Sequence, residues 1–266
     1  MRRLNLFEFH DFSWCPRVLR DGLTDFLEIS IEVLDTYGPV RTRIANLLAT
    51  ASPRAVVDLC SGAGGPWVHW LRKGLVDLPV TLTDKYPNAE LRARLGAANG
   101  LSYRAEPVDA LAVPPDLKGV RTMFTAFHHF RPEQAQAIIE DAVQNRQPIG
   151  IFEFTSRSPK AVLFMLSSAI GVWLFTPRMK NVSWKKWILT YAIPCIPLLV
   201  TVDGILSCFR SYSERELSAM ATGEGYTWSI GVERGKNGLP VTYLIGYPSE
   251  HASAIDNHQN SCDVMG

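Results

Sequence analysis

The sequence predicts an α/β fold in which a mostly parallel sheet carries helices on both faces. Two observations predict it. Segments rich in β-branched residues alternate with amphipathic segments between residues 51 and 155, the order that parallel strands joined by helices produce. The first such segment ends near Asp58 and enters a turn that contains Gly62, Gly64 and Gly65. α/β proteins use this order of strand, glycine turn and helix to seat a nucleotide-like ligand, although such turns also serve as tight connections.

The elements before residue 156 follow from this alternation. Apolar residues at three- and four-residue steps predict an N-terminal helical cap over residues 1–50. These apolar residues are Leu19, Leu23, Phe26, Leu27, Ile31 and Leu34. Residues 51–155 are predicted to form a cofactor-binding core. Its predicted elements are strands at 55–60, 79–83, 102–106, 120–127 and 148–154 and helices at 66–75, 88–99 and 132–145.

Residues 213–250 are predicted to complete the core with a last helix and a terminal β-hairpin. Two β-rich runs, 226–233 and 239–248, are separated by a segment that contains Asn237-Gly238, a strong hairpin signal. Residues 251–266 are polar, and we expect them to form a flexible tail.

Residues 156–212 are predicted to form an apolar helical insertion between strands five and six. Two apolar runs, 161–176 and 184–209, make up most of it. A membrane-spanning helix needs about 20 uninterrupted apolar residues. The first run is shorter, and the second contains prolines and Asp203. A hydrophobic lid or substrate wall is therefore favoured. The alternatives are an interfacial helix pair on a membrane, a homodimer surface and a subdomain that only enlarges the core.

Composition excludes several other classes of protein. The 266 residues carry a formal net charge of +1, which gives no reason to expect a nucleic-acid partner. The five cysteines show neither a disulfide framework nor metal-ligand spacing, so no metal is expected. No continuous apolar core follows Arg2 and Arg3, which argues against a secretory signal. We expect a cytoplasmic protein, with association to a membrane through 156–212 left open.

Polar residues end the next strands at the same edge of the predicted sheet. Asp84 closes the second strand a little over 20 residues after the glycine turn, where doubly wound sheets commonly receive ribose hydroxyls. Asp109 follows the third strand, and the fourth opens into Thr125 and the pair His128 and His129.

With these residues in place, the sequence resembles the class I methyltransferases that use S-adenosylmethionine. Their first motif, Asp/Glu-x-Gly-x-Gly-x-Gly, stands here as Asp58-Leu59-Cys60-Ser61-Gly62-Ala63-Gly64, with Cys60 in place of the first glycine. The resemblance covers residues 50–155, with a weaker echo near the C-terminus. It implies a Rossmann-like, seven-stranded sheet in which one strand of the terminal hairpin is antiparallel.

The resemblance also implies a cofactor site. Asp84 would bind the ribose, Asp109 the adenine amino group and the glycine turn the methionine end. Trp67 would line the pocket for the methionine end, or alternatively belong to the core. Tyr86 would pack on the adenine, or alternatively form a surface turn. The full set of implied cofactor residues is Asp58, Cys60, Ser61, Gly62, Gly64, Trp67, Asp84, Lys85, Tyr86, Asp109, Ala110 and Thr125.

His128 and His129 are the candidates for a general base, since the fourth strand should open onto the transferred methyl group. On a strand end, one would point inward and its neighbour away. The alternative is that they cap the next helix or bond the backbone. Glu153 ends the fifth strand and is expected to orient a histidine or bind the acceptor. His10 and Trp14 are candidates for acceptor contact, or for ordinary packing at a helix start.

The predicted function is transfer of a methyl group from S-adenosylmethionine to an oxygen or sulfur nucleophile of a small or lipophilic acceptor. A small thiol is one candidate, because its pKa near neutrality demands little from a base. Two alternatives remain. One is an NAD(P)-dependent oxidoreductase. The other is a non-catalytic module that binds a membrane or a protein partner through residues 156–212.

Overall fold

The computed structural model describes residues 1–12, 14–95, 100–179, 182–235 and 240–251. It divides into two compact units. The helical unit comprises Met1–Thr36 and Thr155–Ser213, and the sheet unit comprises Tyr37–Phe154 and Glu214–Gly266. The tail predicted at 251–266 lies outside the described residues, apart from His251.

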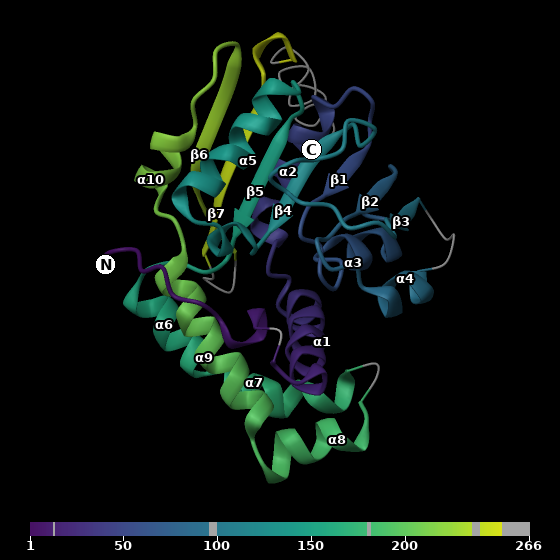
Figure 1. The fold of residues 1–266 in the computed structure, drawn as a ribbon, viewed down its shortest axis with the longest axis vertical. Helices are drawn as coiled ribbons and strands as arrows, with labels where there is room; N and C mark the ends of the chain where they lie inside the picture. The colour runs from purple at the N-terminus through teal and green to yellow at the C-terminus, as the bar shows by residue number, and fades with distance from the viewer. Residues whose placement is uncertain (13, 96–99, 180–181, 236–239, 252–266) are drawn as a thin grey trace. The chain divides into compact units, whose positions relative to one another are not determined.

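The sheet unit contains a seven-stranded sheet in the order β3-β2-β1-β4-β5-β7-β6 (Figure 1). Strands β1 to β5 are parallel, and β7 runs antiparallel to both β5 and β6. The strands are β1 Val56–Asp58, β2 Val80–Leu82, β3 Leu101–Tyr103, β4 Val120–Phe124, β5 Ile149–Glu153, β6 Tyr226–Arg234 and β7 Pro240–Pro248. The predicted mostly parallel, Rossmann-like sheet is confirmed. The hairpin turn predicted at Asn237-Gly238 lies outside the described residues.

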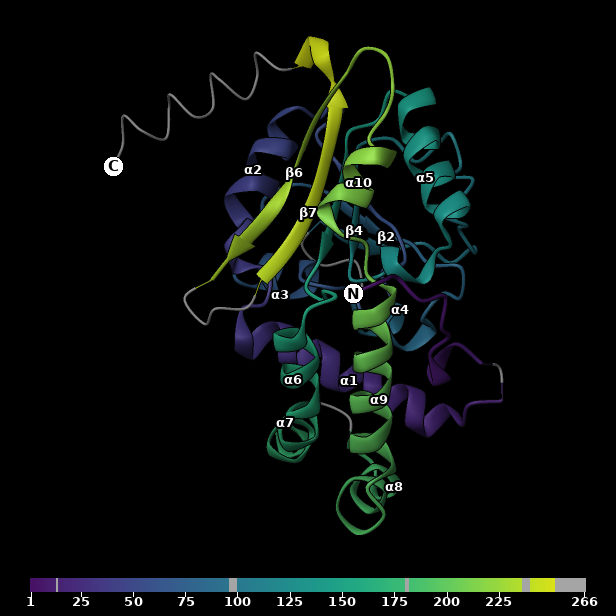
Figure 2. The same ribbon diagram turned by 90° about the vertical axis from the view of Figure 1, so that its left-hand side faces the viewer.

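Helices cover both faces of this sheet, with α2 on one face and α5 and α10 on the other (Figure 2). The helices of the unit are α2 Arg41–Ala49, α3 Trp67–Arg72, α4 Ala89–Leu95, α5 Pro132–Gln144 and α10 Glu214–Met220, with short turns η2 Gly38–Val40, η3 Phe127–His129 and η6 Ser249–His251. Every residue of β4 and β5 is buried, as expected of central parallel strands covered on both faces.

The structure shortens several predicted elements, among them the strands predicted at 55–60 and 102–106 and the helix predicted at 66–75, and in two cases it shows the cause. The N-terminal cap does not extend to residue 50, because α2 buries Ile44 and Leu47 within the sheet unit. Leu47 lies so close to β5 that a Cβ added to Gly150 would stand 2.6 Å from its Cδ2. The fourth strand ends at Phe124 instead of continuing to residue 127, because Thr125 adopts a positive φ of 46°.

The helical unit combines the N-terminal helix with the insertion between β5 and β6. Its elements are η1 Phe9–Asp11, α1 Arg17–Leu34, α6 Pro159–Leu166, α7 Ser168–Phe175, η4 Thr176–Arg178, α8 Trp184–Trp187, the π turn η5 Ile188–Ala192 and α9 Cys195–Arg210. Both the N-terminal helix and the helical insertion were predicted.

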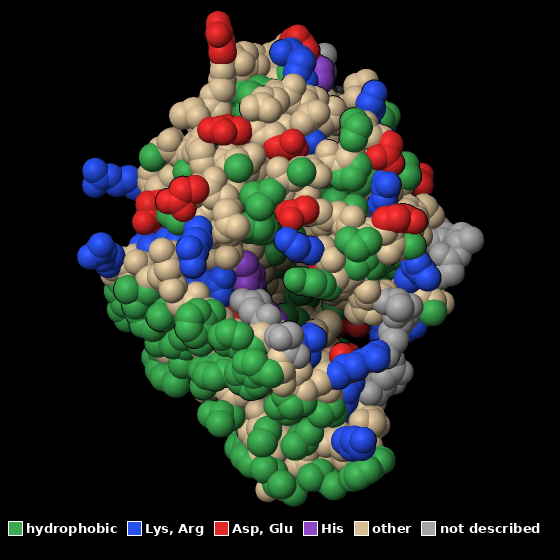
Figure 3. Space-filling model, in the orientation of Figure 1, with side chains coloured by type: hydrophobic (Ala, Val, Ile, Leu, Met, Phe, Trp, Pro, Cys, Tyr) green, Lys and Arg blue, Asp and Glu red, His purple; other side chains and the backbone are tan. Residues whose placement is uncertain are grey.

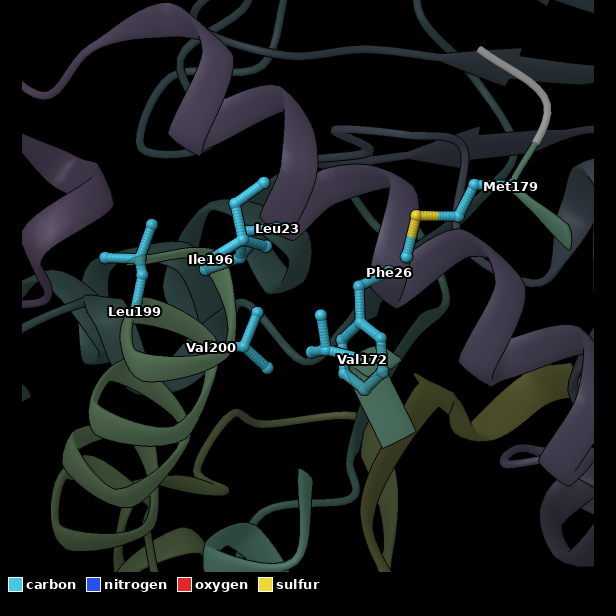
Figure 4. Close-up of a cluster of buried hydrophobic side chains, with 7 residues drawn as sticks. All are labelled: Leu23, Phe26, Val172, Met179, Ile196, Leu199 and Val200. Atoms are coloured by element: carbon cyan, nitrogen blue, oxygen red, sulfur yellow. The ribbon is translucent and has the colours of Figure 1, made fainter. Parts of the chain in front are cut away.

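A cluster of buried side chains joins α1, α7 and α9 (Figure 4). Its members are Leu23, Phe26, Val172, Met179, Ile196, Leu199 and Val200. Two of the residues that predicted the helical face, Leu23 and Phe26, supply its α1 side. Gly22 permits close approach of α1 and α9, since a Cβ there would lie 2.7 Å from the Cδ1 atom of Ile196.

Candidate cofactor and proton-transfer site

The turn after β1 is built from residues in the left-handed conformation. Cys60, Gly62, Gly64 and Gly65 have φ values of 55°, 49°, 93° and 50°. Gly64 is required twice over, because an added Cβ would also lie 2.4 Å from the Cγ2 atom of Val68 in α3. Gly62 faces open space, with no atom within 4 Å of such a Cβ. The turn therefore leaves room for a ligand beside Gly62.

Cys60 occupies the position where the methyltransferase motif has its first glycine. A side chain in the left-handed region costs about 1 kcal/mol. Burial raises the pKa of the Cys60 thiol, and the carboxylates of Asp84, Asp58 and Asp109 add to this effect. The thiol therefore stays protonated, and Cys60 acts as a turn residue rather than as a nucleophile.

The residues beneath the turn form a buried network. The carboxylate of Asp58 is 1% exposed and accepts hydrogen bonds from Trp67 Nε1 (3.1 Å) and Thr122 Oγ1 (2.6 Å). Ser61 Oγ and Thr83 Oγ1 donate to the main-chain oxygen of Asp58, both at 2.8 Å. Burial raises the pKa of Asp58 to about 7, although the hydrogen bonds from Thr122, Ser61 and Trp67 lower it.

This network shows what three of the predicted cofactor residues do within the protein. Trp67 is fully buried and anchors Asp58, which supports the alternative that its side chain belongs to the core. Asp58 and Ser61 are buried as well, and the polar atoms of their side chains bond groups within the protein. They hold the turn in shape, because these bonds tie β1 to the starts of the neighbouring loops.

Asp84 lies beside the open side of the turn. Its Oδ2 accepts the N–H of Gly62 at 2.9 Å, and its Oδ1 accepts the N–H of Tyr86 at 2.8 Å. Each carboxylate oxygen can accept a further hydrogen bond. Tyr86 is 82% exposed. This geometry leaves Asp84 and the Tyr86 ring available to a ligand beside Gly62.

Asp109 is linked to the same edge through Lys85. Lys85 Nζ donates to Asp109 Oδ2 at 2.8 Å, and this bond lowers the pKa of Asp109, with the N–H of Leu111 adding to the effect. Asp109 is thus held ionised. Ala110 is 4% exposed, and its predicted contact with the cofactor stays a prediction.

Thr125 lies at the end of β4 in a conformation that β-branched residues rarely adopt. A hydrogen bond of 2.5 Å to the hydroxyl of Tyr37 holds it there, and the N–H of Phe154 approaches the same Oγ1 at 3.4 Å. Tyr37 is 1% exposed, and burial raises its pKa, so the phenol stays protonated. Sequence reasoning missed Tyr37. The aromatic hydroxyl directly before Gly38-Pro39 was the available signal.

Replacing Tyr37 by phenylalanine tests how much this contact stabilises the unit. The substitution removes the hydroxyl that meets Thr125, so we expect the free energy of unfolding to fall by about 1 kcal/mol. Urea denaturation of both proteins measures the difference. Equal midpoints and slopes would show that the strained conformation of Thr125 does not depend on Tyr37.

His128 and Glu153 form a buried pair. Nδ1 of His128 lies 2.6 Å from Oε2 of Glu153, and Oε1 of Glu153 accepts the N–H of Phe127 at 2.7 Å. His128 is 1% exposed, whereas His129 is partly exposed. Of the two predicted roles for Glu153, orienting a histidine is the one that the geometry supports.

The two histidines do not alternate as residues of a strand end would. They lie on the turn η3, and their ring centroids are 4.3 Å apart. The prediction that one points inward and the other away is therefore wrong, because the strand ends at Phe124 and the chain coils before reaching them.

The remaining candidates, His10 and Trp14, belong to the helical unit. Nδ1 of His10 lies 2.9 Å from Oδ2 of Asp203, which also accepts the main-chain N–H of His10 at 3.1 Å. Trp14 is 65% exposed and stacks on Phe12. Within this unit His10 contacts α9 and Trp14 packs on its neighbour Phe12. Their contact with an acceptor stays a prediction.

Comparison with known proteins supports the fold. No family model matches the sequence, and no curated protein matches it. Among solved structures, an O-methyltransferase from neocarzinostatin biosynthesis, determined with S-adenosylmethionine and 2-hydroxy-5-methyl naphthoic acid, matches 84% of this chain and 56% of its own. The TM-score is 0.50 and the identity 14%. This chain has the class I methyltransferase fold.

The glycine turn, Asp84 and His128 follow the neighbouring parallel strands β1, β2 and β4, and Glu153 ends β5. The sheet order therefore brings them to the same edge of the sheet.

A plantazolicin methyltransferase, determined with a triazolic analogue and SAH, is also similar. It matches 87% of this chain and 98% of its own, with a TM-score of 0.49 and 11% identity.

Proposed function

We propose that this protein is an S-adenosylmethionine-dependent methyltransferase that acts on an oxygen or sulfur nucleophile of a small or lipophilic acceptor. The observation that carries the proposal is the open turn at Gly62 with the Asp84 carboxylate at its amide. The class I methyltransferase fold, in which this edge of the sheet receives the cofactor, supports it.

The residues present at this edge fit the cofactor. Asp84 retains acceptor capacity for a pair of ribose hydroxyls, and the exposed ring of Tyr86 offers a surface for a purine. Asp109, held ionised by Lys85, offers acceptor oxygens for the adenine amino group. Gly62 lets the backbone approach the ligand closely. When bound, the cofactor supplies an electrophilic methyl group on a sulfonium.

The chain's own residues then position the acceptor and receive its proton. A neutral His128 that donates its Nδ1–H to Glu153 carries its lone pair on Nε2. Nε2 is accordingly the atom that would accept the proton of an acceptor hydroxyl or thiol. Glu153 fixes this tautomer and ring orientation while its second oxygen is held by the N–H of Phe127.

Two observations favour a small or lipophilic acceptor. The apolar runs at 161–176 and 184–209 offer surface for a lipophilic substrate. The neocarzinostatin enzyme was determined with a naphthoic acid, so this fold accommodates compact aromatic acceptors. A thiol would need the least help from a base, because its pKa lies closest to neutrality.

Replacing Asp84 by alanine tests the cofactor site. We expect the affinity for S-adenosylmethionine to fall about tenfold to a hundredfold, because the ribose hydroxyls lose a charged acceptor. Isothermal titration calorimetry measures it. The matched control is Asp77→Ala, an exposed aspartate in the same unit, which should bind as the wild type does.

Unchanged affinity in Asp84→Ala would remove Asp84 from the ribose role. A wild-type protein that fails to bind S-adenosylmethionine would overturn the proposal. To find the acceptor, cofactor labelled in its methyl group is incubated with the protein and a pooled cell extract. We expect label in an organic-soluble or volatile product. Tight cofactor binding without any product would favour a non-catalytic module.

A further inference from the structure

The helical unit exposes an apolar face. Figure 3 shows hydrophobic side chains gathered over helices α6, α7, α8 and α9. We call this surface the apolar face. Its exposed members are Leu163, Leu166, Ile170, Trp173, Leu174, Trp184, Trp187, Ile188, Tyr191, Ile193 and Leu198.

The exposed side chains recur with helical spacing. On α6 and α7 they stand at steps of three and four residues, while Met165 and Val172 on the other side are buried. The combined helix Pro159–Arg178 is 20 residues long, yet only 17% of its most apolar stretch is buried. A helix that is apolar on all sides is normally surrounded by a protein core or by lipid. The exposed side of Pro159–Arg178 has neither within this unit.

Aromatic side chains of the apolar face connect α7 to η5. Trp173 Nε1 donates to the main-chain oxygen of Thr190 at 3.0 Å, and Tyr191 Oη donates to that of Trp173 at 2.7 Å. Trp187 stacks on Tyr191 at 4.9 Å. Tryptophan and tyrosine are enriched where a bilayer meets water, because each ring has an apolar body and a polar tip.

The charge of the same segment is almost entirely positive. Between residues 156 and 212 the sequence contains one acid, Asp203, which is buried and bonded to His10. Its basic residues are Arg157, Lys160, Arg178, Lys180, Lys185, Lys186 and Arg210. Lys160, Arg178 and Lys185 are exposed. An apolar face bordered by cations is complementary to a bilayer that contains anionic lipid.

We propose that the apolar face docks this protein on an anionic lipid bilayer, with its helices lying in the interface rather than crossing the membrane. The leucines and isoleucines enter the boundary of the acyl chains. The tryptophans and Tyr191 sit at the level of the headgroups, and Lys160, Arg178 and Lys185 meet the lipid phosphates.

Crossing the bilayer is incompatible with the packing on the other side of these helices. The buried cluster holds α7 and α9 against α1, whose sequence includes Asp21, Asp25 and Glu28. Asp25 forms a partly buried ion pair with Lys186 of α8. A helix crossing at Pro159–Arg178 would carry these charges into the hydrocarbon, which is costly. The second candidate span is bent by 72° between Trp184–Ala192 and Cys195–Arg210.

A second copy of the chain suits the face less well than lipid does. Symmetric dimers place the same patch on both partners, so the exposed cations of one face would meet those of the other. Like charges brought together in this way oppose association. Anionic lipid headgroups neutralise the same cations.

Vesicle flotation tests the proposal on the full-length protein. Vesicles of phosphatidylcholine with phosphatidylglycerol should carry the protein, and vesicles of phosphatidylcholine alone should carry less of it. Leu163→Asn and Leu198→Asn, at side chains 68% and 64% exposed, should each lower the partition coefficient about tenfold. The matched control Leu75→Asn, at an exposed leucine of the sheet unit, should leave it unchanged.

The cations are tested separately. The double variant Lys160→Gln/Lys185→Gln should lose at least fivefold in binding to anionic vesicles and little in binding to neutral ones. Because all these side chains are exposed, the variants should fold, and circular dichroism checks this. A blue shift of tryptophan fluorescence on adding vesicles gives an independent signal from the wild-type protein.

Three outcomes would overturn the inference. The first is no binding to anionic vesicles. The second is concentration-dependent dimerisation that Leu163→Asn abolishes, which would assign the face to a second copy. The third is membrane association that resists alkaline carbonate, which would indicate a spanning helix. Vesicle binding requires neither cofactor nor acceptor, so it succeeds or fails independently of the proposed methyl transfer.

Discussion

His128→Asn is expected to lower kcat for methyl transfer about a hundredfold to ten-thousandfold. Asparagine retains a donor to Glu153 in place of Nδ1–H but has no atom in place of Nε2. The variant therefore preserves the buried hydrogen bond and removes only the proposed proton acceptor. The acceptor's KM should change little, because binding does not require the lone pair. Steady-state kinetics with the identified acceptor measure both quantities.

The pH profile distinguishes a base from a structural histidine. A base must be neutral to accept a proton, so kcat/KM of the wild type should rise with pH as the histidine titrates. His128→Asn should lose this limb of the profile. His129→Asn is the matched control, at the neighbouring ring 4.3 Å away, and should retain it. Equal kcat values in wild type and His128→Asn would exclude His128 as the base.

Glu153 acts through His128 and is therefore a positioning residue. In Glu153→Gln, an amide N–H faces Nδ1 while the amide oxygen keeps the bond from Phe127 N–H. The ring proton would then move to Nε2, and kcat should fall with little change in KM. Glu153→Asp retains a carboxylate and should restore part of the rate, which a purely structural defect would not predict.

The fold could be predicted because its signals are local. Strand β5 is buried throughout and appears in the sequence as the short apolar run Ile149–Phe152, as central parallel strands do. Strand β4 is equally buried, although it includes Arg121 and Thr122. The glycine turn was recognisable because only glycine fits Gly64, where both φ and the approach of Val68 exclude a side chain. The position of Asp84 at the end of the second strand could be predicted because that strand follows the glycine turn at the usual distance.

The errors in the site arise from contacts between residues far apart in sequence. The hydroxyl of Tyr37 holds Thr125, 88 residues later, in a conformation that its own propensity disfavours. Strand β4 ends just before Thr125, and His128 lies on the turn η3 that follows. Similarly, the position of Trp67 just after the turn left open whether it lines the ligand site or belongs to the core. Its burial against Asp58 and Thr122 depends on how α3 packs, which spacing alone does not reveal.

Asp58 should make the stability of the sheet unit depend on pH. Its pKa is raised from 3.8 to about 7 in the folded protein, chiefly by burial. Between these values the folded state holds a proton that the unfolded state has lost. The stabilisation is therefore complete below about pH 4 and is lost as pH rises through 7. At 1.36 kcal/mol per pKa unit, the loss amounts to about 4 kcal/mol at most.

Asp58→Asn removes this titration while keeping an oxygen that can accept from Trp67 and Thr122. The variant's stability will be offset from that of the wild type, so the informative quantity is the difference between the two across pH. We expect the free energy of unfolding of the wild type, relative to Asp58→Asn, to fall by about 2–4 kcal/mol from pH 4 to pH 8. Urea titrations at a series of pH values measure it. A constant difference would mean that Asp58 is ionised throughout this range, and that the hydrogen bonds from Trp67 and Thr122 to its carboxylate outweigh the cost of burial.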